Sequence, residues 1–144
     1  MGEKIKKILI VDDEKTILLS LAYALKTEGV EVITCNKSEW AERALSNYRF
    51  DLVITDVRLS GTQGKEGLQI LELTKKKNPD TPVIVMTAYG SPEVQKDAKR
   101  LGAYRYFDKP IDINVLMDCI SRLKIPVPRD KFSGAKTKKA KKSP

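Results

Sequence analysis

The sequence predicts an α/β fold, a doubly wound sheet of five parallel strands with helices on both faces. Two observations lead to this prediction. Five short runs of β-branched, aliphatic or aromatic residues alternate with segments whose apolar residues are spaced by three and four. Each strand and the helix after it take about 20 to 25 residues, and strands joined by helical crossovers run parallel. A chain of 144 residues suffices for one such domain.

The five expected strands span residues 6–11, 30–34, 51–55, 82–86 and 104–107. The first, third and fourth are apolar almost throughout, which is typical of strands buried on both faces of a parallel sheet. The second and fifth contain more polar residues, which favours positions near the sheet edges. The first run ends in three acids and lacks a small-residue cleavage site, so we interpret it as a strand and not as a secretion signal.

Apolar residues at helical spacing predict the helices and the side chains that pack in the core. The four clearest stripes are Ile17, Leu21 and Leu25; Trp40, Ala44 and Tyr48; Val94, Ala98 and Leu101; and Leu116, Ile120 and Leu123.

Local signals predict where several helices begin and end. Gly29 is expected to close the first helix, and the segment Asn78-Pro79-Asp80 to end the third. Ser91, followed by Pro92, is expected to cap the fourth helix, which Gly102 closes.

The net charge of +8 is concentrated near the C-terminus. Residues 129–144 hold seven Lys or Arg and one Asp, so the rest of the chain carries only +2. We therefore predict a domain over 1–125 and a basic tail over 126–144, which lacks apolar periodicity and is expected to be disordered. The hypotheses for the tail are a solvated linker, an arm that contacts nucleic-acid phosphates without sequence preference, and the start of an output domain.

The composition excludes several classes of chemistry. The chain has no His, so histidine catalysis and histidine metal ligation are excluded. Cys35 and Cys119 fit no metal or redox spacing, and we interpret them as reduced core thiols. No apolar run approaches the roughly 18 residues of a membrane span, so we expect a cytoplasmic protein with no membrane contact. Chemistry must then use carboxylates, Lys, hydroxyls and a hard metal ion.

Reactive side chains follow four of the expected strands. They are Asp12 and Asp13 after the first, Asp56 after the third, Thr87 at the end of the fourth, and Lys109 after the fifth. In an open α/β sheet the ligand site lies beyond the carboxyl ends of the strands. We therefore expect these five side chains to meet at one edge.

Such a set suits phosphoryl transfer without histidine. Neighbouring carboxylates repel one another, and Mg²⁺, which prefers oxygen ligands, relieves that repulsion. The metal and the Lys109 ammonium would neutralise charge on the transferred group, and the Thr87 hydroxyl would donate a hydrogen bond to it. Asp56, which follows the middle strand of the expected sheet, is the candidate nucleophile.

Four strings of residues resemble the receiver domains of two-component response regulators: KILIVDDE, DLVITDVRL, VIVMTAY and GAYRYFDKP. They occur in the family's order and spacing, and the resemblance covers about residues 5 to 124. The string MTAYGSPE is similar to receivers of enhancer-binding transcription activators. The resemblance implies a flavodoxin-like (βα)5 sandwich with strand order 2-1-3-4-5.

The resemblance also implies a role for each site residue. Asp56 is implied to be the phosphoacceptor. Asp13, Asp56 and the backbone carbonyl of Arg58 are implied to ligate Mg²⁺, and Asp12 to hold a coordinating water. The segment after Arg58 fits the family poorly, because Ser60 replaces a common proline and the helix-opening glycine lies about three residues later than usual.

The same resemblance implies a conformational switch. Lys109, before a cis proline, pairs with the phosphoryl oxygens, Thr87 moves to bond one of them, and Tyr106 turns inward. The surface of the fourth helix, fifth strand and fifth helix then changes. The implied phosphodonor is a sensor histidine kinase or a histidine phosphotransfer protein, and a second phosphorylated copy is a further candidate partner.

Plainer interpretations exist for the same residues. Asp13 would be a helix cap, Thr87 an ordinary strand residue, Lys109 a solvated loop lysine and Tyr106 a core residue. The alternative functions are a Mg²⁺-dependent phosphohydrolase or nuclease, and a pseudo-receiver that binds partners unmodified. An aspartate-based phosphatase would need an acid at position 58, where this chain has Arg. We therefore expect a regulatory phosphoacceptor and not a turnover enzyme.

Overall fold

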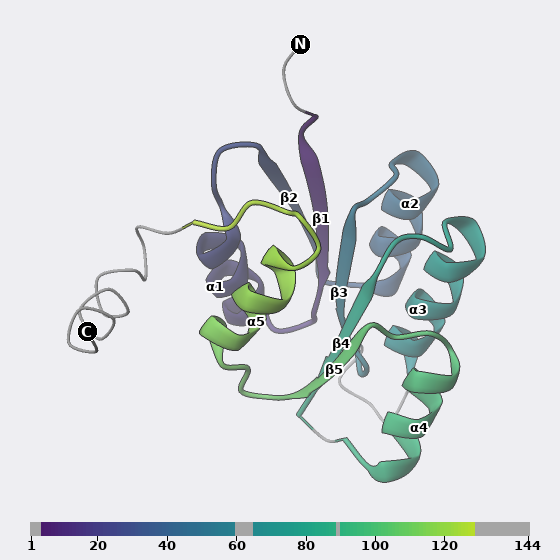
Figure 1. The fold of residues 1–144 in the computed structure, drawn as a ribbon. Helices are drawn as coiled ribbons and strands as arrows, with labels where there is room; N and C mark the ends of the chain where they lie inside the picture. The colour runs from purple at the N-terminus through teal and green to yellow at the C-terminus, as the bar shows by residue number, and fades with distance from the viewer. Residues whose placement is uncertain (1–3, 60–64, 89, 129–144) are drawn as a thin grey trace, which may run out of the picture.

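The structure is a computed structural model, and it describes residues 4–59, 65–88 and 90–128. The tail beyond residue 128 and the part of the loop that contains Ser60 lie outside the described residues. Within the described ranges the chain forms five strands and five helices in strict alternation (Figure 1).

All five strands belong to one parallel sheet. They are β1 (Lys6–Val11), β2 (Val30–Cys35), β3 (Leu52–Asp56), β4 (Val83–Thr87) and β5 (Arg105–Asp108), in the order β2-β1-β3-β4-β5. Every residue of β3 and β4 is buried, whereas most residues of β2 and β5 are partly or fully exposed. The predicted fold class and strand order are confirmed, and so are the two edge strands.

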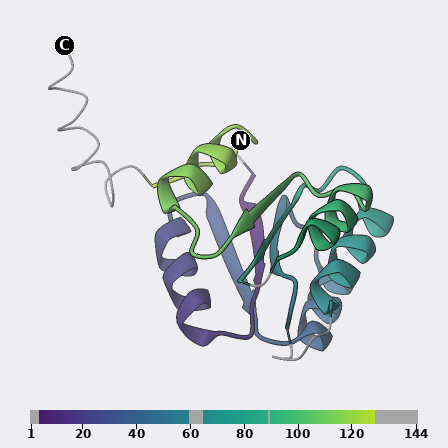
Figure 2. The same ribbon diagram turned by 90° about the horizontal axis from the view of Figure 1, so that it is seen from below.

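The helices form two layers. One face of the sheet is covered by α1 (Lys15–Leu25) and α5 (Ile113–Ser121), and the other by α2 (Ser38–Asn47), α3 (Glu66–Lys77) and α4 (Pro92–Arg100), as Figures 1 and 2 show. Side chains alternate between the two faces of a strand. The core therefore divides into two clusters, and in β1 the residues Ile8 and Ile10 belong to one and Leu9 and Val11 to the other.

Helix α2 corrects one of the predicted stripes. Trp40 is 49% exposed and Tyr48 48% exposed, so the prediction that both pack in the core is wrong. The helix buries Ala41 and Leu45 instead, which form the adjacent row of the same surface. The small side chain of Ala41 lets the helix approach the sheet closely, and the bulky Trp40 is left at the margin.

The helix ends confirm three of the four predicted signals. Ser91 caps α4 with its side chain, Gly102 follows that helix with φ +99°, and α3 ends one residue before Asn78. The prediction for Gly29 is wrong, because α1 already ends at Leu25. Gly29, with φ +86°, instead forms the turn that enters β2, where a left-handed conformation is required.

The chain after α5 packs back onto the domain. Ile125 is part of the core cluster under α1 and α5, Val127 packs against that cluster, and Pro128 is buried. Cys35 and Cys119 are both buried free thiols, as predicted. Among the helices of the described ranges, none combines the length and the hydrophobicity that a bilayer crossing requires.

Candidate functional site

The parallel sheet brings the predicted side chains to one edge. Asp56 and Thr87 are the last residues of β3 and β4, and Asp12 and Lys109 directly follow β1 and β5. Because all strands run in one direction, their carboxyl ends share this edge. A small cavity of about 150 Å³ opens there, lined by Asp13, Glu14, Asp56, Arg58, Thr87, Ala88 and Lys109.

Three carboxylates form the acidic part of the site. One oxygen from each of Asp12, Asp13 and Asp56 can be chosen so that all three lie within 4.8 Å of one another. Asp12 and Asp56 are buried, and Asp13 is partly exposed. Oxygen ligands of this number and spacing suit Mg²⁺, which also keeps several waters in its shell. The donor set therefore fits the metal that the sequence predicts.

Lys109 bridges two of the buried acids. Its Nζ lies 2.7 Å from Asp12 Oδ2 and 3.0 Å from Asp56 Oδ2, with the lysine side chain only 9% exposed. The hypothesis that Lys109 is a solvated loop lysine is therefore wrong. The Lys109–Pro110 peptide bond is cis, as the resemblance implies.

Glu14 is a site residue that the sequence analysis did not assign. Its Oε1 lies 3.2 Å from Lys109 Nζ, on an exposed side chain at the mouth of the cavity. The signal was present in the sequence, because Glu14 completes the acidic run that begins at Asp12. A run of adjacent acids after a strand does not reveal which of them turn toward a lysine on another strand.

The structure also decides how α1 begins. The helix starts after Glu14, whose side chain makes no capping hydrogen bond, so Asp13 is not the helix cap. Asp12 Oδ1 instead accepts the backbone N–H of Glu14 at 2.8 Å. This bond orients Asp12 and leaves the Asp13 carboxylate facing the cavity that it lines.

The site shifts the pKa of its acids and of its lysine. Burial raises the pKa of Asp56, although the hydrogen bond and the charge of Lys109 oppose the rise. Burial raises the pKa of Asp13 as well, and the charges of Asp12 and Glu14 add to it. Burial alone would lower the pKa of Lys109, but the hydrogen bonds to Asp12 and Asp56 outweigh it and the pKa rises. The site thus holds a permanent cation beside carboxylates that are costly to ionise.

We expect the Asp13→Ala variant to be more stable than wild type in metal-free buffer at neutral pH. The raised pKa means that ionised Asp13 destabilises the folded state, by an amount on the order of 0.5 kcal/mol because solvent screens this partly exposed group. The gain should disappear as the pH falls below the ordinary value of 3.8, because Asp13 then becomes protonated in both the folded and the unfolded state. Thermal melts at several pH values measure it.

Asp12→Ala serves as the control for this prediction and should change stability in the opposite direction, because Asp12 holds Lys109 and the Glu14 N–H. Millimolar Mg²⁺ should raise the melting midpoint of wild type and leave that of Asp13→Ala nearly unchanged. A loss of stability in metal-free Asp13→Ala would contradict the assignment of mutual repulsion.

Tyr106 and Gly90 form the second part of the site. The Tyr106 ring packs against the cluster under α2, α3 and α4, as expected of a core residue. Its hydroxyl oxygen is buried and has no hydrogen-bond partner among the described residues. A Cβ at Gly90 would overlap this oxygen and would lie 2.9 Å from Thr87 Cγ2. Gly90 therefore provides the space that the inward ring occupies, a role that the sequence analysis missed.

Gly67 anchors the loop after β3. Its N–H donates to the Val57 carbonyl at 2.8 Å, and a Cβ at this position would overlap the backbone carbonyl of Asp56. We expect Gly67→Ala to destabilise the domain by about 2 kcal/mol or more, because two backbone segments would have to separate. Chemical denaturation measures this. Gln69→Ala, at an exposed position of the same helix, should stay within about 0.5 kcal/mol of wild type.

Comparison with known proteins shows the family. The pattern of the response regulator receiver domain matches residues 8–121, and the chain belongs to this family. Sporulation initiation phosphotransferase F of Bacillus subtilis is 33% identical over 117 residues, which cover 81% of this chain and 92% of that protein. A receiver domain protein (CheY-like) from Methanospirillum hungatei has a structure that superposes with a TM-score of 0.76 at 31% identity, covering 84% of this chain and 95% of that one.

Longer regulators match as well. Response regulator protein FleR of Pseudomonas aeruginosa is 34% identical over 116 residues, 81% of this chain. The match covers only 24% of FleR, so the chain spans about a quarter of the length of the first such relatives. Others in this group are named as transcriptional regulatory proteins. The predicted resemblance to receivers of transcription activators is confirmed.

Proposed function

We propose that the chain is a phosphorylation switch in which Asp56 accepts a phosphoryl group from the phosphohistidine of a sensor histidine kinase or a histidine phosphotransfer protein. The observation that carries this proposal is the Lys109 ammonium, which lies 3.0 Å from Asp56 Oδ2 in a small cavity lined by acids. The Asp56 carboxylate can attack phosphorus in this position. The Lys109 cation, and a metal ion held by the neighbouring acids, would neutralise the negative oxygens of the incoming phosphoryl group.

The proposed reaction needs no further catalytic residue. A carboxylate oxygen of Asp56 forms the new bond to phosphorus, the phosphorus–nitrogen bond of the donor breaks, and its electron pair leaves with the imidazole. Lys109 stays protonated throughout, because its pKa is raised, and it pairs with a phosphoryl oxygen. Asp13, Asp56 and the Arg58 backbone carbonyl would hold Mg²⁺, with Asp12 holding a coordinating water. The metal supplies charge neutralisation to the transferred group.

The alternative of a phosphohydrolase or nuclease has less support. A cavity of about 150 Å³ has room for a phosphoryl group but little more. Position 58 is Arg, so the acid that an aspartate-based phosphatase would use to activate water is missing. We therefore propose a regulatory phosphoacceptor with slow self-dephosphorylation as its only turnover. The full set of acids, Thr87 and Lys109 likewise disfavours an unmodified pseudo-receiver.

The proposed output is a change on the face formed by α4, β5 and α5. Thr87 lies at the end of β4 with its side chain buried, next to the Gly90 space that holds the Tyr106 hydroxyl. A phosphoryl group on Asp56 would attract the Thr87 hydroxyl. Because Thr87 lies next to the space that holds the Tyr106 hydroxyl, this movement would favour the inward position of the Tyr106 ring. A ligand shifts such an equilibrium only by its different affinity for the two states. Asp118 on α5 and Arg122 just after it are exposed, and they offer both signs of charge to a partner.

We propose two further partners, a second copy of the chain and nucleic acid. A second phosphorylated copy could dock on the same face, with the domain taken as residues 1–125. The tail over 126–144 could contact nucleic-acid phosphates, since all but +2 of the net charge lies beyond residue 128. Both are proposals for a chain whose longer relatives contain additional sequence.

Incubation with acetyl phosphate and Mg²⁺ tests the proposed function directly. Intact-mass spectrometry should show the gain of one phosphoryl group, and chelating the metal should prevent the gain. Sustained release of inorganic phosphate with no modified protein at any time point would instead support the hydrolase. Absence of both retained label and donor turnover would support the pseudo-receiver.

A further inference from the structure

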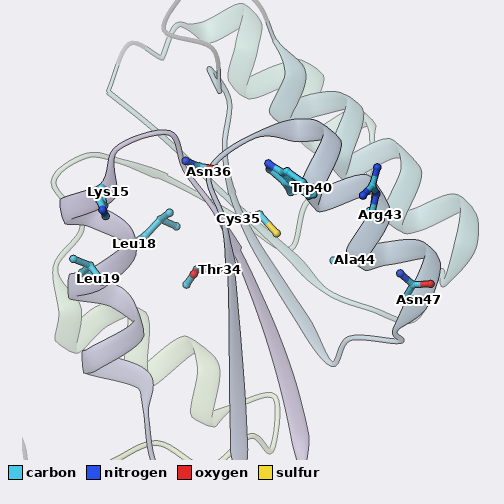
Figure 3. Close-up of a pocket in the computed structure, with 10 residues that line it drawn as sticks. All are labelled: Lys15, Leu18, Leu19, Thr34, Cys35, Asn36, Trp40, Arg43, Ala44 and Asn47. Carbon is cyan, nitrogen blue, oxygen red and sulfur yellow. The ribbon is translucent and has the colours of Figure 1, made fainter.

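A second hollow, separate from the phosphoacceptor site, lies along the outer edge of β2. It has a volume of about 550 Å³, and we call it the β2-edge groove. Figure 3 shows its walls, with one side from α1, the other from α2, and strand residues between them. The lining residues are Lys15, Leu18, Leu19, Thr34, Cys35, Asn36, Trp40, Arg43, Ala44 and Asn47. None of them lines the cavity at Asp56.

The floor of the groove is a strand edge with open hydrogen-bonding groups. Within the described residues β2 pairs only with β1. The carbonyls of Gly29 and Cys35 point toward β1, since they accept the N–H groups of Lys6 and Asp12. Peptide groups along a strand alternate in direction. Val32 and Thr34, one residue out of phase, therefore direct their N–H and C=O groups away from β1, and Thr34 lines the groove.

The two walls of the groove are placed to contact the side chains of an added strand. A strand joining this edge would lie about 4.8 Å beyond β2, with successive side chains pointing toward α1 and toward α2. Leu19, 62% exposed, offers apolar contact on the α1 side, and Trp40 does so on the α2 side. Exposed apolar side chains on both sides of an open edge are unusual, because such edges invite association.

The charge of the groove selects among occupants. Lys15 stands on the α1 wall and Arg43 on the α2 wall, with the Arg43 guanidinium 5.1 Å from the centre of the Trp40 ring. None of the ten lining residues is acidic. A second copy that joined through the same groove would bring two more cations and no acid from its own lining residues. An acidic segment would pair with both of them, so charge complementarity favours a different partner.

We propose that the β2-edge groove binds an extended segment of a partner protein by strand addition, and that this segment alternates apolar and acidic side chains. Backbone hydrogen bonds to Val32 and Thr34 supply the register. Leu19 and Trp40 receive the apolar side chains, and Lys15 and Arg43 select the acidic ones. The groove lies along β2, whereas β5 forms the other edge of the sheet. Binding there does not depend on phosphorylation of Asp56.

The test uses the full chain and a matched pair of seven-residue peptides. One alternates Val with Glu, and the other alternates Val with Lys. Trp40 is the only tryptophan of the chain, so its fluorescence reports binding in the groove without a label. The Glu peptide should change the fluorescence with saturation and should bind at least tenfold more tightly than the Lys peptide.

Two variants separate the backbone and the charge contributions. Thr34→Pro removes one outward N–H while the bonds to β1 remain, a substitution that edge strands accept, and it should abolish binding. Lys15→Glu combined with Arg43→Glu should reverse the preference between the two peptides and keeps the strand unchanged if the proline variant fails to fold. Lys76→Glu, an exposed position of α3, should bind like wild type.

Several outcomes would overturn the proposal. Equal binding of both peptides, or of neither, would show that the groove does not select acidic strands. Binding that survives Thr34→Pro in a folded variant would exclude strand addition. Self-association of the chain in sedimentation experiments, lost in Thr34→Pro, would assign the edge to a second copy instead.

Discussion

Replacing Asp56 with asparagine is expected to abolish phosphoryl uptake completely. The amide keeps the size of the side chain and can still meet Lys109, but it lacks the anionic oxygen that attacks phosphorus. Under conditions in which wild type gains one phosphoryl group from acetyl phosphate and Mg²⁺, Asp56→Asn should gain none. Intact mass measures the difference, and peptide mapping of the wild-type product should place the label on Asp56.

Asp80→Asn is the matched control. Asp80 is exposed in the turn before β4, at the opposite edge of the sheet from the site. It should be labelled like wild type. Equal labelling of Asp56→Asn and wild type would refute the phosphoacceptor assignment, whereas a loss in both variants would point to a defect of folding. Circular dichroism distinguishes these cases.

The second large effect is on stability. Lys109→Met is expected to destabilise the domain by about 3 kcal/mol in metal-free buffer at neutral pH, because it leaves Asp12 and Asp56 as buried charges without their cation. Methionine fills a similar volume, so the loss of charge dominates. Urea denaturation measures the change. Lys7→Met, which breaks the half-exposed pair with Glu31, should cost no more than about 1 kcal/mol.

The pH dependence of this effect has a defined sign. Lys109 has a raised pKa in the folded state, so its stabilisation is complete below the ordinary lysine value of 10.5 and is lost as the pH rises through the folded-state pKa. In the variant, Asp56 loses the cation that opposes the rise of its pKa, so the pKa of Asp56 should rise further. The variant should therefore recover stability relative to wild type as the pH falls toward 4, about the ordinary Asp value, and Mg²⁺ should restore part of it. A difference that is constant with pH would contradict the ion-pair explanation.

Both predictions follow from a conflict between the function of the acidic site and the stability of the folded domain. The acids that make the site able to hold a metal and accept a phosphoryl group are costly to keep ionised, as the raised pKa values of Asp13 and Asp56 indicate. Lys109 offsets part of that cost without a metal. Sites that carry function often sacrifice stability in this way.

Most of the fold follows from local patterns. Five apolar runs of the right length, separated by helical stripes, predict a parallel sheet, and the polarity of the second and fifth runs correctly predicts the edges. The ends of parallel strands must share one edge. For this reason the sequence alone was enough to bring Asp56, Thr87 and Lys109 together.

Local patterns predicted buried residues less well where two neighbouring rows of side chains on a helix could both face the core. Trp40 and Ala41 belong to adjacent stripes of α2, and hydrophobicity favours the tryptophan. The structure buries Ala41 because the distance between helix and sheet decides which row fits. Likewise, Gly29 looks like a helix end, but α1 stops at Leu25 and the glycine serves the turn into β2.

Patterns in the sequence were enough to predict the fold class, the end of the sheet at which the site lies and the residue types that meet there. The contacts of Lys109 with Asp12 and Asp56 became visible only in the folded chain, as did the room that Gly67 leaves for the Asp56 carbonyl and Gly90 for the Tyr106 hydroxyl. The two kinds of feature differ in the distance along the chain over which they are set. Periodicity and turn chemistry act over a few neighbouring residues, whereas these close approaches depend on how separate strands and helices pack, to within a fraction of an ångström.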